Sequence, residues 1–322
     1  MNLPSKRTLS TFALAMFNVS IMASLRNLPM NAQLGYSLPW FFCLLGFCFL
    51  MPCSLVSAEL ATGWSQKGGI YIWVKEAFGD RWGLLAIWMQ WAHNFTWYPA
   101  ILSFAATTVS YLIKSPLTEH PLYLPIAVPL TFWIITLLNC LGIKVSSWIS
   151  TLGAILGTII PGILLIGLSI LWIANDRPLT IPLSLHSFIP HINNRDHLVL
   201  MVGMFLSFGG LEVSAGYANR VKNPQRHYPR AIWIATVITF CLLSVGGLAV
   251  AIVIKPINID LVSGLMETFH HYLSPYSLTW LLPTLGGFIA FGAIAEINSW
   301  VIGPVHSLHT TGIHGNIPPL LQ

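Results

Sequence analysis

Eight apolar stretches, each long enough to cross a lipid bilayer, follow one another along this chain of 322 residues. A membrane-spanning helix needs about 20 mostly apolar residues, and a helix satisfies its own backbone hydrogen bonds inside lipid. Only 8% of the residues are charged, far below the share of about a quarter in soluble domains. We therefore predict an all-α, polytopic membrane protein and exclude a soluble enzyme and a nucleic-acid-binding domain. The predicted spans are 11–31, 38–60, 82–112, 123–141, 146–174, 197–217, 230–254 and 276–308.

Basic residues are shared unevenly between alternate loops. Ten Lys and Arg residues lie before the first span, in loop 62–81, at Lys144 and in loop 218–230, whereas the loops on the other side hold four. Cytoplasmic loops carry an excess of Lys and Arg. The pattern predicts that both termini are cytoplasmic, with the chain in the cell inner membrane.

Three segments outside the spans have their own pattern. Segment 66–80 is too polar to cross and predicts an amphipathic helix on the cytoplasmic face. Segment 258–273 predicts a similar helix on the external face. Segment 175–196, rich in proline and polar residues, reads as an external loop that joins two groups of spans.

Two of the spans are interrupted by residues that disfavour a continuous helix. The first contains Arg26-Asn27 followed by Pro29, and the proline should bias Asn27-Leu28 away from α geometry. The sixth contains Gly209-Gly210, with Glu212 close behind. Irregular backbone survives in a membrane only around a protein-lined cavity. Broken helices at corresponding positions in two halves predict a transporter site near the bilayer midplane.

The broken ends suggest the chemistry of the ligand. Half-helix N-termini would offer N–H groups to a carboxylate, and stray carbonyls would accept from an ammonium, so an amino acid suits the arrangement. The alternative is that glycine and proline only let neighbouring helices pack closely. We favour that alternative for Pro161 and for Gly153-x-x-x-Gly157 in the fifth span.

Four charged residues lie in or near the spans, where a charge is costly and is a functional candidate by default. Glu59 lies at the cytoplasmic end of the second span, where we expect an interfacial or packing role. Glu212 and Glu296 are candidates for a gating or proton-linked role, and a structural role for Glu212 is the alternative. Arg26 has two open roles, an ion pair with one of the glutamates or a bidentate grip on an anionic substrate.

The third span carries a polar and aromatic cluster, His93, Asn94, Trp97 and Tyr98. It could line a cavity or could hold helices together. The histidines do not show a helical metal-binding spacing beside a carboxylate, and a Gly-x4-Gly-Lys-Ser/Thr motif is missing from the sequence. We predict a transporter rather than an enzyme, with no metal, no cofactor and no use of ATP.

Several motifs of this chain resemble the amino acid–polyamine–organocation superfamily. They are SFGGLEVSAGYANRVKNPQRHYPRA around the sixth span, SLRNLP in the first, ELATGWSQKGGIYIWVKEAFGDRWG after the second and AEINSWVIGP in the eighth. The last three look like the glutamate/GABA antiporter branch and related bacterial amino acid antiporters. The resemblance implies an inverted repeat of five plus five helices with discontinuous helices 1 and 6. Residues 1–174 would form the first repeat and 197–322 an incomplete second one.

The resemblance also implies an antiporter that exchanges an external amino acid for an internal amino acid or its decarboxylation product by alternating access. Its partners would be an amino acid substrate and the bilayer, without nucleic acid, and a homodimer is one candidate assembly. The residues that the resemblance assigns to the substrate site are Ser24, Leu25, Arg26, Asn27, Ser207, Phe208, Gly209, Gly210, Asn94, Tyr98 and Trp300, with Glu212 and Glu296 beside it.

Two features depart from the family pattern. The glutamate/GABA antiporters carry an aromatic-acidic stretch where this chain has Arg26-Asn27. Such transporters also have about twelve spans, of which this chain would hold eight. The chain would then be a fragment of a longer protein, or a truncated, transport-inactive remnant or partner subunit.

Overall fold

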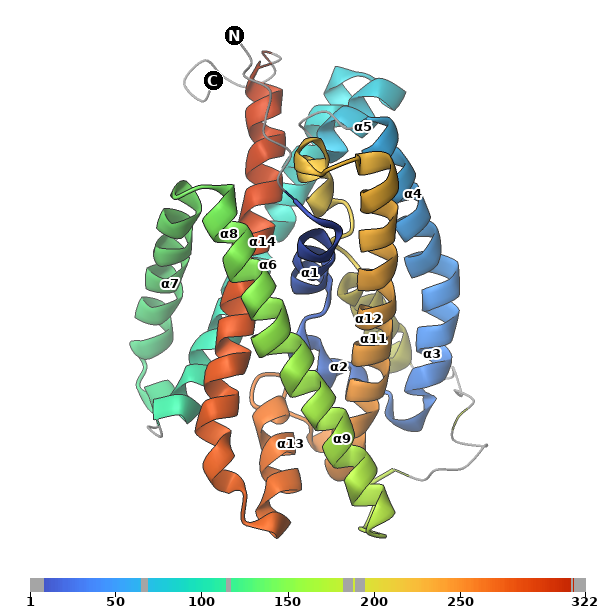
Figure 1. Cartoon of the computed structure of the whole chain (residues 1–322). Coiled ribbons are helices and arrows are strands. Elements are labelled where there is room, and N and C mark those ends of the chain that lie inside the picture. Colours follow the sequence, from blue (N-terminus) through green and yellow to red (C-terminus); the bar gives the residue numbers. More distant parts are fainter. Residues whose placement is uncertain are drawn as a thin grey trace.

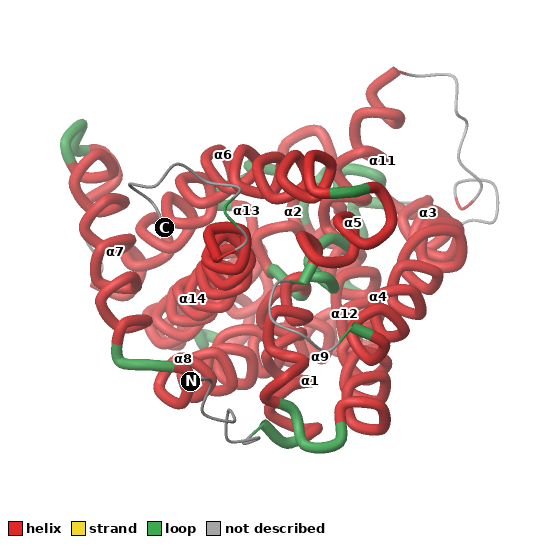
Figure 2. The backbone as a smooth tube through the Cα atoms, turned by 90° about the horizontal axis from the view of Figure 1, so that it is seen from above, coloured by secondary structure: helices red, strands yellow, loops and turns green. Residues whose placement is uncertain are grey.

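In the computed structural model, which describes residues 9–64, 69–113, 117–181 and 195–313 together with Phe188 and Gly315, the chain is a bundle of helices. The described residues form no β-strand (Figure 2). Prediction and structure agree on an all-α membrane protein. Of the predicted connecting loop 175–196, residues 182–187 and 189–194 lie outside the described residues, as do the basic residues Lys6, Arg7, Lys67 and Lys114.

Figure 1 shows the helices by label, with α7 at one flank of the bundle and α3 and α4 at the other. In chain order they are α1 (Thr11–Met22), α2 (Leu28–Ala32), α3 (Leu38–Leu45), α4 (Met51–Gly63), α5 (Ile70–Phe78), α6 (Asp80–Ile113), α7 (Tyr123–Cys140), α8 (Ile143–Leu152), α9 (Ile160–Ala174), α11 (Arg195–Ser207), α12 (Pro224–Val253), α13 (Gly264–Leu273) and α14 (Leu282–Ile313). One turn of π-helix joins α3 to α4, and another joins α8 to α9.

Five helical stretches among the described residues are long and apolar enough to cross a membrane. They are Gly35–Gly63, Tyr123–Cys140, Lys144–Ala174, Pro224–Val253 and Thr279–Ile313. The other three predicted spans are helical but differ in kind. Spans 11–31 and 197–217 are each broken into shorter pieces, and span 82–112 lies in α6, which is long but carries the polar cluster.

The first break lies upstream of the place that the proline predicted. Helix α1 ends at Met22, and the chain leaves helical geometry at Ala23 (ψ 62°) and Ser24 (ψ 114°). A 3₁₀ turn, Leu25–Asn27, then leads into α2. The prediction that Asn27-Leu28 leaves α geometry is wrong, because both have α-helical dihedral angles. Pro29 lies in the first turn of α2, where its missing N–H costs no hydrogen bond.

The second break lies where the paired glycines predicted it. Helix α11 ends at Ser207, and Gly210 has a φ of 107°, a left-handed conformation that a side chain would strain. The chain then turns into a 3₁₀ helix, Val213–Arg220. Both discontinuities predicted for helices 1 and 6 are therefore present in the structure.

The small residues of the fifth span let two helices touch through their backbones. A Cβ atom added at Gly157 would lie 2.3 Å from the backbone nitrogen of Gly292 in α14, and one added at Gly153 would lie 2.0 Å from the Cβ of Ala295. Pro161, also in this span, is buried in the first turn of α9. The close-packing interpretation of these residues agrees with the contacts.

The two predicted amphipathic segments are helical. Within 66–80, α5 follows Gly69 and ends before Gly79, and residues 66–68 lie outside the described part of the chain. The Lys75 ammonium lies 2.8 Å from the Asp80 carboxylate, whose hydrogen bond raises the pKa of Lys75. Within 258–273, α13 buries most of its side chains against neighbouring helices, so it is a packed element.

A fully buried polar network fixes α14 against α8 and α1. The side-chain amide of Asn298 donates to the hydroxyls of Ser146 and Ser150, at 2.9 and 3.0 Å. The hydroxyl of Ser299 lies 2.6 Å from that of Ser150 and 3.2 Å from that of Ser20 in α1. Buried polar groups with partners define a unique packing, and here they set the position of the next residue, Trp300.

Candidate functional site

A cavity of about 800 Å³ lies between the two helix breaks. Residues of the first break and of the second line it, and α6 and α14 supply further walls. The lining residues are Arg26, Asn27, Met30, Phe49, Ile70, Ala86, Met89, Gln90, His93, Thr96, Trp97, Ala100, Gly203, Phe205, Leu206, Ser207, Gly209, Gly210, Glu212 and Trp300. Two segments that lie far apart in the sequence thus line one cavity.

The first break contributes the basic residue of the cavity. Arg26 is partly exposed to it, and among the described residues its guanidinium has neither a hydrogen-bond partner nor an ion pair within 4.0 Å. Glu296 on α14 lies close enough to Arg26 to interact with it electrostatically, and it also lies beside Ser24. Glu296 is 5% exposed and does not line the cavity, so it is buried behind the cavity wall, near Arg26.

The second break contributes Glu212. One carboxylate oxygen of Glu212 accepts a hydrogen bond from the backbone N–H of Gly210, at 3.2 Å. This contact is the structural role that the sequence left open for Glu212, since the carboxylate satisfies a donor freed by the unwound backbone. The same side chain lines the cavity, so the structural contact does not remove it from the functional candidates.

Trp300 links the two breaks. Its indole N–H donates to the carbonyl of Ile21 at 3.1 Å, which satisfies one of the free carbonyls at the end of α1. A Cβ atom added at Gly210 would lie 3.0 Å from the indole ring, so the second break packs against the same side chain. Trp97 and His93 of α6 lie beside the indole, with ring centroids 4.8 and 6.0 Å away.

We expect Trp300→Phe to lower the thermal stability of the purified chain. The phenyl ring keeps most of the packing but leaves the Ile21 carbonyl without its donor, at a cost of about 1–3 kcal/mol. The matched control is Trp148→Phe, at a tryptophan that is 69% exposed on α8. The melting temperature should fall only for Trp300→Phe, and an equal fall in the two variants would contradict this role.

One face of α6 lines the cavity with residues of the predicted cluster and with one residue, Gln90, that the sequence analysis did not single out. Gln90, His93 and Trp97 follow one another at intervals of three and four residues, which places them on the same helix face. Of these, His93 and Trp97 belonged to the predicted cluster, whereas Gln90 did not. The helical spacing was the signal that could have found it.

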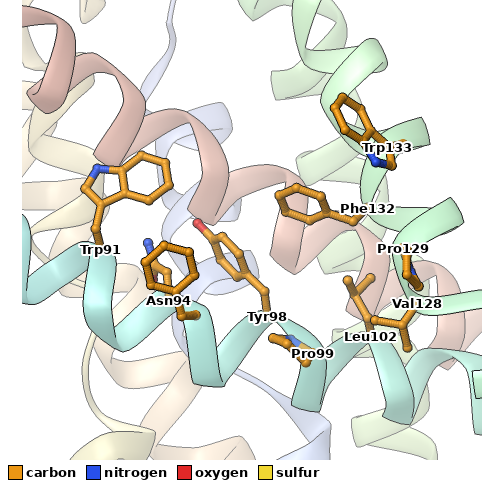
Figure 3. A pocket seen from close by; sticks show the side chains of 10 residues that line it. Trp91, Asn94, Tyr98, Pro99, Leu102, Val128, Pro129, Phe132 and Trp133 are labelled. Carbon is orange, nitrogen blue, oxygen red and sulfur yellow. The ribbon is translucent and has the colours of Figure 1, made fainter. Parts of the chain in front are cut away.

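Several predicted site residues lie elsewhere. Ser24, Leu25 and Phe208 belong to the breaks but are buried and do not line the cavity. Asn94 and Tyr98 line a second cavity of about 260 Å³ between α6 and α7, where Tyr98 and Phe132 project from the two helices (Figure 3). The hydroxyl of Tyr98 also donates to the Trp300 carbonyl at 3.2 Å, so Tyr98 supports the wall of the first cavity from behind.

Residues 9–322 match the amino acid permease family. The chain belongs to this family. Its members are membrane transporters and not enzymes, which agrees with the apolar helices and with the cavity between two broken ones. The chain is thus a multi-pass membrane protein of the permease family.

Three relatives show what this permease is similar to. An uncharacterized transporter of Legionella pneumophila is 39% identical over 99% of this chain and 68% of its own length. A glutamate/gamma-aminobutyrate antiporter of Lactococcus lactis is 30% identical over 99% of this chain and 64% of its own length. A cadaverine/lysine antiporter of Escherichia coli is 26% identical over 82% of this chain and 56% of its own length. The permease therefore spans about two thirds of the length of the first two relatives.

Proposed function

We propose that this permease carries the substrate site of a secondary amino acid antiporter in the bacterial inner membrane. It exchanges an external amino acid for an internal amino acid or its decarboxylation product by alternating access, with both termini cytoplasmic. The observation that carries the proposal is a cavity that residues of both helix breaks line together. The antiporters among the relatives add support, since two of them exchange an amino acid for an amine or for GABA.

The proposed architecture is the inverted repeat, with residues 1–174 as the first half and 197–322 as the part of the second half in this chain. The breaks at Ala23-Ser24 and at Phe208–Glu212 occupy corresponding places in the first helix of each half. Arg26, Asn27, Ser207, Gly209, Gly210 and Trp300 line the proposed substrate space directly, and Ser24, Leu25, Phe208, Tyr98 and Glu296 support its walls. Asn94 lines the second cavity instead.

Counterflow in proteoliposomes tests this function. The purified chain is reconstituted with unlabelled L-glutamate or GABA inside, and uptake of labelled amino acids is followed from outside. We expect uptake only into preloaded vesicles, because an obligatory exchanger needs an internal substrate. A monodisperse, folded chain that takes up none of the twenty amino acids and no GABA would refute the proposal and favour a transport-inactive membrane protein.

We propose Glu212 as the proton-linked group of this exchange, with Glu296 as the counter-charge of Arg26. We expect Glu212→Gln to flatten the dependence of exchange on pH while the KM for substrate changes little, because glutamine keeps the size of the side chain and cannot release a proton. The measurement is the initial exchange rate at a series of pH values.

The matched control is Glu59→Gln, at a carboxylate on α4 that is exposed and outside the cavity. It should keep the wild-type pH profile. If folded Glu212→Gln keeps that profile as well, Glu212 has only the structural role of holding the Gly210 N–H.

A further inference from the structure

The polar side chains in and near the cavity differ in whether they have hydrogen-bond partners. One carboxylate oxygen of Glu212 accepts a hydrogen bond from the Gly210 N–H. Glu296 is buried outside the lining of the cavity, beside Ser24. Arg26 faces the cavity with a guanidinium that carries five N–H donors, and no hydrogen bond from it ends on a described residue. The cavity therefore offers strong donors that the described residues leave available to a ligand.

Arg26 has a counter-charge but not a binding partner. Glu296 acts on it electrostatically, yet the two side chains do not form an ion pair within 4.0 Å in the described part of the chain. A nearby opposite charge lowers the cost of burying Arg26, and its hydrogen-bond donors stay available to a ligand. Guanidinium and carboxylate groups match each other in a bidentate geometry.

From this asymmetry we infer that Arg26 is the specificity-determining residue of the site and that the ligand must carry a carboxylate. The inference rests on the proposed function and narrows it to amino acids and other carboxylate-bearing substrates. A diamine supplies only donors and a second positive charge, so it leaves Arg26 unsatisfied and repels it. Of the substrate types named for the relatives, glutamate and GABA fit this site and cadaverine does not.

His93 and Glu212 are the other titratable side chains among the residues that line this cavity. His93 packs beside the rings of Trp97 and Trp300, and Glu212 holds the second break. Neither side chain supplies a second guanidinium, with its paired N–H donors, for a carboxylate. Among the titratable side chains that line the cavity, Arg26 is therefore the one suited to hold a carboxylate, which makes a single substitution informative.

Equilibrium binding to the purified chain tests the inference without requiring transport. Labelled L-glutamate is the probe, and unlabelled GABA and putrescine compete with it. These competitors have four carbons each and one ammonium in common, and they differ in a carboxylate against a second ammonium. We expect GABA to displace the probe and putrescine to leave it bound, whereas equal displacement by both would overturn the inference.

A second experiment measures glutamate binding to variants of Arg26. We expect Arg26→Gln to weaken glutamate binding by roughly ten- to a hundredfold, and Arg26→Lys to weaken it less, because lysine keeps the charge without the fork. Lys144→Gln removes an exposed basic charge outside the cavity and should bind as the wild type does. Because Arg26→Gln leaves Glu296 buried without its counter-charge, the double variant Arg26→Gln/Glu296→Gln is measured beside it.

The double variant should restore folding and not glutamate binding. Wild-type affinity in either folded Arg26→Gln protein, or a wild-type chain that does not bind glutamate, would overturn the inference. Binding without counterflow would refute the proposed antiport and leave the role of Arg26 intact. Counterflow that does not depend on Arg26 would refute the role of Arg26 and leave the proposed antiport intact.

Discussion

Gly157→Leu should prevent the purified chain from reaching a stable fold. At this position α14 approaches so closely that a Cβ would lie 2.3 Å from one backbone atom and 2.4 Å from another, both of Gly292. A rotamer change cannot relieve a contact between a side chain and a backbone, so the helices must separate. Overpacking of this kind costs about 3 kcal/mol or more, a large part of the stability of a folded protein.

The measurement is the yield of monodisperse protein in size-exclusion chromatography, followed by thermal unfolding. The matched control is Gly167→Leu, ten residues further along the same helical stretch, where an added Cβ would have no atom within 4 Å. That variant should behave as the wild type does. If Gly157→Leu gives a wild-type yield and melting temperature, the contact between α14 and the fifth span is looser than the structure shows.

Gly210→Ala should abolish substrate binding and lower stability at the same time. The residue has a φ of 107°, which strains any residue with a side chain by about 1–3 kcal/mol. The new methyl group would also lie 2.5 Å from Ile21 Cγ2 and 3.0 Å from the Trp300 ring. Because the indole is tied to the Ile21 carbonyl, the methyl group pushes against both breaks at once.

Glutamate binding and thermal unfolding of Gly210→Ala are measured beside Gly209→Ala. An added Cβ at Gly209 would meet only the Leu206 carbonyl, at 3.3 Å, so Gly209→Ala tests whether any methyl group in this loop destabilises the chain. We expect a clearly lower melting temperature for Gly210→Ala than for Gly209→Ala. Similar melting temperatures for the two would show that the conformation of Gly210 is not required.

The sequence predicted the features that depend on composition and on backbone chemistry. The apolar stretches predicted the helices, and Gly209-Gly210 predicted the second break, because two glycines in a row rarely continue a helix. The spacing of Gly153 and Gly157 predicted a close helix contact. In each case the property belongs to the residue itself and needs no knowledge of its neighbours.

The features that depend on helix rotation were harder to predict. His93 and Asn94 are adjacent on α6, yet they line two different cavities, because successive helical residues point about 100° apart. The first break lies at Ala23-Ser24, and Pro29 falls in the first turn of α2. The residues just before Pro29 keep α-helical angles, although a residue before proline generally avoids them. The position of Glu296 behind Arg26 follows from tertiary packing alone.

The buried network of Ser20, Ser150 and Ser299 has a consequence for movement. A hydroxyl both donates and accepts, so the three serines join α1, α8 and α14 without placing a charge in the low-dielectric interior. Separating these helices would leave buried hydroxyls without partners. We therefore expect the three helices to move as one unit when the protein changes conformation.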